Sequence, residues 1–133
     1  MAVLIDTDLL IDLERGLRVP EIDAALGGED RAISVITVSE LLHGVLRAAG
    51  AVRLARRAFV EHVLAGIEAI PVTAPVARVH AEIWAGLAAR GETIGAHDMW
   101  IAATALAHGF GVATRNTGGY GRIEGLRVVT PPR

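Results

Sequence analysis

Short apolar runs that alternate with helical patterns constrain the fold of this chain more than any other feature. Strands are predicted over residues 2–5, 32–35, 68–72, 110–114 and 126–129, and helical patterns fill the segments between them. Strands that alternate with helices favour a mainly parallel sheet flanked by helices on both faces. The chain has 133 residues, which predicts one α/β domain over residues 1–133.

Glycine and proline mark the ends of the predicted elements. One helix is expected to be capped by Asp8 and to stop near Gly16. Pro71 indicates that the run 68–72 lies at an edge of the sheet, and the glycines after Asn116 predict a loop. Further helices are expected over residues 19–26, 37–49, 52–66, 75–90 and 96–108.

Four polar residues stand where strands end or helices begin. Asp6 directly follows the first strand, and Asn116 follows the fourth. Glu40 and Asp98 lie in the first turns of two predicted helices. Because ligands of open α/β sheets bind beyond the carboxyl ends of the strands, all four can face one crevice. Carboxylates suit Mg²⁺ or Mn²⁺, so the pattern predicts a metal-dependent hydrolase if the fold brings these residues together.

Each of these residues also has a purely structural interpretation. Asp6 can be a turn residue beside a helix cap at Asp8, although a buried acid without a partner is costly. Thr37-x-x-Glu40 matches a capping box, which explains Glu40 equally well. The helix dipole favours an acid at Asp98, and an Asn after a strand is common in turns. Asp6 and Asp98 therefore carry the functional interpretation most strongly.

The composition excludes several classes of protein. There is no cysteine, so disulfides and thiolate chemistry are absent. No run approaches the roughly 20 apolar residues that span a bilayer, and no signal peptide is recognised, so a cytoplasmic location is expected. The net charge is −2 and hydrophobic residues make up 52% of the chain, which indicates apolar surface kept for a partner rather than a general affinity for nucleic acid.

A second motif points to a different enzyme and fails on one residue type. Asp6-Thr7-Asp8 after an apolar run resembles the opening of haloacid dehalogenase-like phosphatases. That family requires a lysine near the phosphoryl group, and this chain contains none. The phosphatase therefore remains only a remote alternative.

Taken together, the motifs resemble those of the PIN-domain ribonucleases and, within them, the VapC toxins of toxin–antitoxin pairs. The resemblance runs over nearly the whole chain, and its order and spacing make it specific. The matching segments are Ile5-Asp6-Thr7, Ile36-Thr37-Val38-Ser39-Glu40-Leu41-x-x-Gly44, Asp98-x-x-Ile101-Ala102-Ala103-Thr104-Ala105 and Ala113-Thr114-Arg115-Asn116. Gly119-Tyr120 stands where the family often has Asp-Phe, so this chain lacks that carboxylate.

The resemblance implies a PIN-like three-layer sandwich and an Mg²⁺-dependent endoribonuclease, with Mn²⁺ as a plausible substitute. Its catalytic acids map onto Asp6, Glu40 and Asp98, and Asn116 takes a fourth position in the metal site. Asp6, Glu40 and Asp98 repel one another unless a cation is bound. The substrate is expected to be structured RNA, contacted by Arg115 as a phosphate clamp together with Thr7 and Asp8.

The resemblance also implies protein partners. A cognate antitoxin is expected to hold the enzyme inactive, with a segment in the groove and an Arg directed toward the acids. A homodimer is expected, within a heterotetramer or larger complex with the antitoxin, and the predicted helix 75–90 is a candidate for the dimer face. A PIN-like module that binds RNA or protein with little catalysis remains the main alternative.

Overall fold

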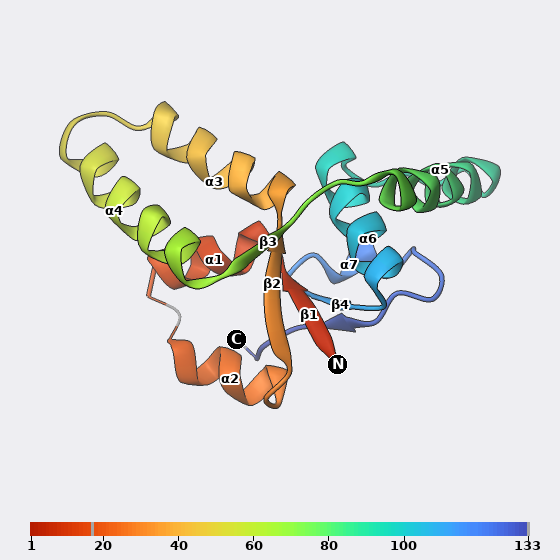
Figure 1. Cartoon of the computed structure of the whole chain (residues 1–133), viewed down its shortest axis with the longest axis horizontal. Helices are drawn as coiled ribbons and strands as arrows, with labels where there is room; N and C mark the ends of the chain where they lie inside the picture. Colours follow the sequence, from red (N-terminus) through yellow and green to blue (C-terminus); the bar gives the residue numbers. More distant parts are fainter. Residues whose placement is uncertain (17, 133) are drawn as a thin grey trace.

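A five-stranded parallel sheet forms the centre of the computed structural model, which describes residues 1–16 and 18–132 (Figure 1). The strand order is β3-β2-β1-β4-β5, and all four pairings are parallel. The predicted parallel sheet and the edge position of the third strand are thus confirmed. The strands are β1 (Ala2–Ile5), β2 (Asp30–Ser34), β3 (Glu68–Ile70), β4 (Gly111–Ala113) and β5 (Val128–Val129).

Helices cover both faces of the sheet, which gives the predicted three-layer α/β sandwich (Figure 1). α1, α2, α3 and α4 contribute side chains to the core on one face, and α6 covers the other with α5 packed against it. In the described part of the chain the helices are α1 (Thr7–Glu14), α2 (Val19–Leu26), α3 (Val35–Arg47), α4 (Gly50–Gly66), α5 (Ala74–Ala89), α6 (Ala96–His108) and α7 (Thr117–Tyr120). Within that part, no helix combines the length and the apolar character needed to cross a membrane.

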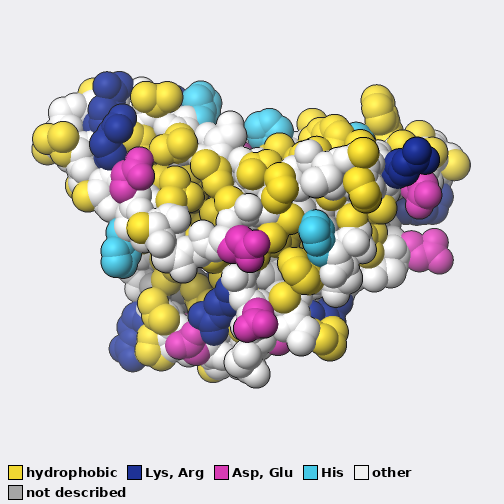
Figure 2. All heavy atoms as spheres, in the orientation of Figure 1, with side chains coloured by type: hydrophobic (Ala, Val, Ile, Leu, Met, Phe, Trp, Pro, Cys, Tyr) yellow, Lys and Arg dark blue, Asp and Glu magenta, His cyan; other side chains and the backbone are white. Residues whose placement is uncertain are grey.

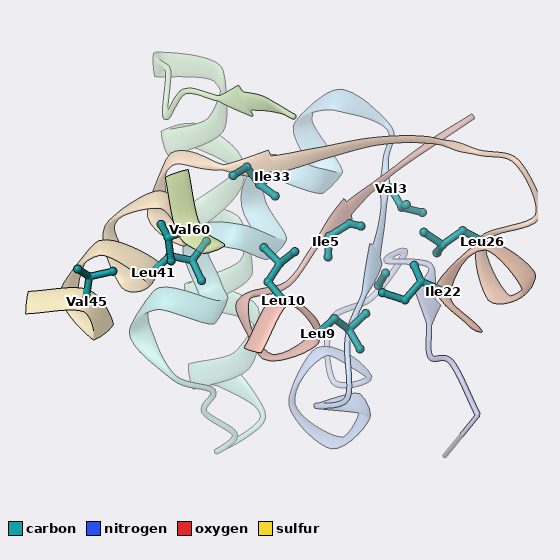
Figure 3. Close-up of a cluster of buried hydrophobic side chains, with 11 residues drawn as sticks. Val3, Ile5, Leu9, Leu10, Ile22, Leu26, Ile33, Leu41, Val45 and Val60 are labelled. Atoms are coloured by element: carbon teal, nitrogen blue, oxygen red, sulfur yellow. The ribbon is translucent and has the colours of Figure 1, made fainter. Parts of the chain in front are cut away.

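The central strand β1 divides the core into two clusters. Val3 and Ile5 point into the cluster shown in Figure 3, and Leu4 points into the cluster on the other face. Successive side chains of a strand alternate between faces, so a strand buried on both sides must be apolar throughout. Burying each such aliphatic side chain contributes about 1.5–3 kcal/mol. The tightly packed β1 therefore provides a rigid base for the residue that follows it, Asp6.

The connections between strands place a crevice beside β1. The chain leaves β1 for β2 and β3 on one side, then returns through α5 and α6 to β4 on the other side. β1 and β4 are paired at Ile5 and Ala113, so their carboxyl ends lie next to each other. Such a reversal of strand order is where α/β folds bind ligands.

The start of α3 differs from the prediction. Strand β2 ends at Ser34, and α3 begins at Val35 rather than Thr37. The Ser34 hydroxyl caps the helix by accepting a hydrogen bond of 3.0 Å from the Ile36 amide. Glu40 consequently lies in the second turn, and the capping-box interpretation of Thr37 and Glu40 is wrong.

The glycine-rich segment after Asn116 forms the short helix α7 instead of the predicted loop. Asn116 caps it, because its side-chain Oδ1 accepts a hydrogen bond of 3.1 Å from the Gly119 amide. The last three strands are shorter than predicted, whereas the predicted helices 19–26 and 96–108 agree with α2 and α6 at both ends.

Candidate metal centre

Asp6 joins the end of β1 to the start of α1. It is the N-cap of α1, so the expectation that Asp8 caps this helix is wrong. Its Oδ1 accepts a hydrogen bond of 2.8 Å from the Thr7 amide, and its Oδ2 accepts one of 2.8 Å from the Thr114 hydroxyl at the end of β4. Asp6 is only 4% exposed. Two neighbouring strand ends thus fix one buried carboxylate.

Glu40 reaches the same place from α3. The Thr7 hydroxyl donates a hydrogen bond of 2.8 Å to Glu40 Oε1 and lies 3.1 Å from the Thr37 hydroxyl. Glu40 Oε2 lies 3.5 Å from Nδ1 of His97, which forms an ion pair when that imidazole is protonated. The capping role of Glu40 is excluded. The hydrogen bond from Thr7 instead holds the Glu40 carboxylate near the end of β1.

Asp98 and Asn116 meet across the other side of the crevice. Asp98 lies in the first turn of α6, and its Oδ2 accepts a hydrogen bond of 2.9 Å from Asn116 Nδ2. The Asn116 oxygen accepts from Gly119, so its nitrogen must face the acid; the opposite orientation would lose both hydrogen bonds. Asn116 therefore orients Asp98, and its oxygen does not point at the carboxylates.

Asp8 and Arg115 also lie at this end of the sheet, in different roles. Asp8 Oδ2 accepts a hydrogen bond of 3.0 Å from the Arg115 amide. The Arg115 guanidinium pairs with Asp12 at 3.1 Å and donates to the carbonyl of Pro131. Its charged end is thus engaged with α1 and the C-terminal segment, an arrangement that does not match the expected phosphate clamp.

Among the described residues, no arginine or histidine forms an ion pair with Asp6, Asp8 or Asp98 of the crevice. Burial raises the pKa of Asp6 to about 7; the charges of Asp8 and Asp98 also raise it, against the hydrogen bonds from Thr114 and Thr7. Burial likewise raises the pKa of Asp8. Such perturbed acids in a cleft are typical of functional sites.

Tyr120 is a member of this site that the sequence did not reveal. It is the last residue of α7 and its side chain is fully buried. Burial, and then the nearby charges of Asp6 and Asp98, raise the pKa of its hydroxyl. A lone aromatic residue after two glycines resembles an ordinary core residue. Only the folding of the 117–120 segment into a helix places its hydroxyl beside the acids.

The acids open onto solvent through a pocket of ≈ 210 Å³, lined by Asp6, Thr7, Asp8, Ile11, Glu40, Asp98 and Asn116. In the part of the chain that is described, no three acidic or histidine side chains are already spaced to hold one metal ion. The donor set still fits Mg²⁺, because this cation keeps several waters and often needs only one or two carboxylates. The buried Asp8 Oδ1, which has no hydrogen-bond partner among the described residues, adds an unused oxygen.

The parallel sheet, with carboxylates where its central strands end, defines a class of α/β domain that binds its ligand at the strand ends. Comparison with known proteins narrows the class. A family model for the PIN domain matches residues 3–125. Ribonuclease VapC1 of Rickettsia felis is 38% identical over 131 residues, covering 98% of this chain and 96% of that protein.

Solved structures show the same likeness. VapBC-5 of Mycobacterium tuberculosis has a TM-score of 0.77 and 30% identity, and the match covers 99% of this chain and 98% of that one. The fold of VapBC2 from Rickettsia felis, bound to a promoter DNA fragment, agrees with a TM-score of 0.89 at 21% identity over 99% of this chain and 100% of that one. The chain belongs to the PIN-domain family, and its resemblance to VapC-type members is confirmed.

Proposed function

We propose that the chain is an endoribonuclease toxin of the VapC type, which hydrolyses phosphodiester bonds in structured RNA and is restrained by an antitoxin. The observation that carries the proposal is the buried, uncompensated carboxylate of Asp6 beside Asp98 and Glu40. The relative in Rickettsia felis is named a ribonuclease, and its full-length similarity supports the same activity here.

Asp6 and Asp98 are the proposed ligands of Mg²⁺ or Mn²⁺, with Glu40 and Asp8 as further acids of the same pocket. A divalent cation at such a site lowers the pKa of a water and neutralises charge on the phosphate. Asn116 contributes by donating to Asp98, and Thr114 by donating to Asp6. Mutation of a residue that orients a metal ligand in this way typically lowers metal affinity or activity about 10- to 100-fold.

Glu40 is the proposed acceptor of the proton from the attacking water. Its Oε1 is engaged by Thr7, and its Oε2 lies beside His97, with which Glu40 lines an adjoining pocket of ≈ 330 Å³. The water oxygen bonds to phosphorus, its proton passes to Glu40 Oε2, and the phosphorus bond to the leaving ribose oxygen breaks. That oxygen takes a proton from solvent. For this reaction the phosphate would enter the acid pocket from its open side.

A groove next to the acids provides the surface for RNA. The acid pocket shares Ile11 and Glu40 with a larger pocket of ≈ 430 Å³ between α1, α3 and α4. Arg15 and Arg47 line the larger pocket and are exposed, and neither forms an ion pair within the described part of the chain. Arginine binds phosphate through two parallel hydrogen bonds. These two residues replace Arg115 as the proposed contacts to the RNA backbone.

The same groove is the proposed seat of the antitoxin. Its floor is apolar, with Leu41 and Val60 buried and Val52 58% exposed at the rim. Figure 2 shows arginines interspersed with hydrophobic side chains over the tip of the α3–α4 hairpin. The VapBC structures that resemble this chain are toxin–antitoxin complexes, which supports a protein partner of that kind. An antitoxin in this groove would compete with RNA.

Helix α5 is the proposed face of a homodimer. Trp84 on this helix is 62% exposed, although a tryptophan normally buries most of its large apolar surface. Its ring makes an edge contact with His80, whose ring stacks on Trp100 of α6. A second copy would cover this aromatic group. Light scattering of the purified chain and of Trp84→Glu tests it, because a charge there should yield monomers.

The decisive experiment compares Asp98→Ala with Asp30→Ala, a matched change of an exposed acid at the opposite end of the sheet. The purified chain should cleave RNA only with Mg²⁺ or Mn²⁺, Asp98→Ala should not, and Asp30→Ala should behave as the unaltered chain. Expression with and without the product of the neighbouring gene, followed by genome-wide mapping of RNA 5′ ends, identifies the RNA. A chain that neither binds a divalent cation nor cleaves RNA would instead be a binding module.

A further inference from the structure

The Tyr120 hydroxyl is an anomaly in the core. Tyr120 is 0% exposed, and its hydroxyl has no hydrogen-bond partner among the described residues. In that part of the chain, the only other buried side-chain nitrogen or oxygen without a hydrogen-bond partner is Asp8 Oδ1. Asp8 lines the acid pocket. Both unpartnered atoms thus lie at the carboxyl ends of the central strands.

Packing does not explain why this residue carries a hydroxyl. The ring lies in the cluster formed with Leu4, Ile101 and Val112, which would hold a phenylalanine equally well. A buried hydroxyl without a partner costs about 1–3 kcal/mol. A group that is costly in one state of a protein and aimed at its site is expected to gain a partner in another state.

The surroundings of the hydroxyl identify that partner. The hydroxyl lies close enough to the carboxylates of Asp6 and Asp98 for both to raise its pKa, but it forms no hydrogen bond of good geometry with either. Both oxygens of Asp6 already accept hydrogen bonds, from Thr7 and Thr114. Asp98 accepts one, at Oδ2 from Asn116, so its carboxylate retains capacity for another donor.

We infer that the Tyr120 hydroxyl is a positioning group for Asp98: it donates a hydrogen bond to this carboxylate when a divalent cation is bound at Asp6 and Asp98. The inference rests on the proposed function and concerns how the cation site is held. Asn116 caps α7 and Tyr120 ends it, so both proposed donors to Asp98 lie on the segment that follows β4, whereas Asp98 lies on α6. A hydrogen bond that forms together with cation binding adds its free energy to the affinity for the cation.

Tyr120→Phe removes one oxygen atom and tests the inference by calorimetry. Affinity for Mn²⁺, used alone as the probe, should weaken about tenfold, which corresponds to about 1.4 kcal/mol. The melting temperature without cation should stay the same or rise, because a hydroxyl without a partner has been removed. Thr93→Val, which removes an exposed hydroxyl, should leave the affinity unchanged. Equal Mn²⁺ affinity in Tyr120→Phe and the unaltered chain would overturn the inference.

A second measurement covers the case in which Tyr120→Phe folds poorly. The chain contains one tyrosine, so incorporation of fluorotyrosine gives a single ¹⁹F resonance. Addition of Mg²⁺, which is diamagnetic, should shift this resonance in the unaltered chain and not in Asp98→Ala. A resonance that does not move while calorimetry detects binding contradicts the inference alone. Absence of cation binding to the unaltered chain contradicts both this inference and the proposed function.

Discussion

The two ends of the sheet handle negative charge in opposite ways. At the amino ends of the strands, Arg127 binds both oxygens of Glu29, at 2.9 Å and 2.6 Å, and lowers the pKa of that acid. At the carboxyl ends, Asp6 has only neutral donors, and burial raises its pKa to about 7. A two-point arginine contact stabilises the charged form of a carboxylate. The contrast distinguishes an acid whose charge the fold satisfies from one that is proposed to bind a cation.

The largest expected effect comes from removing the charge of Asp6. Asp6→Asn keeps the shape of the side chain and removes a proposed metal ligand, so RNA cleavage should fall by at least ~100-fold, the upper end for residues that merely support a ligand. At neutral pH without a divalent cation, the variant should be at least as stable as the unaltered chain. Cleavage assays and thermal melts measure the two effects. Retained Mg²⁺-dependent cleavage would remove Asp6 from the site.

Glu40→Gln should reduce cleavage by about 10- to 100-fold. Because Ser34 caps α3, Glu40 has no capping role, and the melting temperature should not change. Glu61→Gln on α4 is the matched control, since it makes the same change at an exposed position. A decrease in stability with full activity would show that Glu40 acts through the fold after all.

The raised pKa of Asp6 should make the stability of the cation-free chain depend on pH. Between about pH 4 and about pH 7 the folded chain retains a proton on Asp6 that the unfolded chain releases, so stability without a cation falls as pH rises, by on the order of a few kcal/mol. Mg²⁺ should restore more stability at about pH 8 than at about pH 5. Thermal melts of the unaltered chain and of Asp6→Asn measure this, and equal pH profiles for the two would refute it.

The smallest effect is expected at the paired end. Glu29→Gln removes a charge that Arg127 satisfies, and it should lower the melting temperature slightly, less so in high salt. Cleavage and Mn²⁺ affinity should not change. A loss of activity in this variant would mean that the two ends of the sheet are not independent.

The overall fold could be predicted because short apolar runs mark the strands and glycines mark the ends of helices in the local sequence. Strand β1 and helices α2 and α6 were predicted with their observed ends. The start of α3 was missed by two residues, because a strand-like pattern continues through Val35 while the Ser34 hydroxyl already caps the helix. The lengths of the later strands depend on pairing with neighbours, which local sequence does not contain.

The site was predicted in part. Asp6, Glu40 and Asp98 were expected together and lie around one pocket. The orientation of Asn116, the engagement of Arg115 with Asp12 and the hydroxyl of Tyr120 all depend on contacts between segments far apart in sequence. Residue type identifies an acid at a strand end, whereas the partners of a neutral or cationic side chain follow only from the folded chain.

The direct passage from strand to helix at Asp6 and Ser34 limits how this domain can vary in length. Ser34 ends β2, Asp6 directly follows β1, and each caps the following helix, so no loop absorbs an inserted residue. One extra residue after Ser34 would turn Glu40 by about 100° around α3 and away from Thr7. Natural insertions, tags and engineered fusions should therefore be tolerated at the Arg47–Gly50 turn between α3 and α4, and rejected at these two junctions.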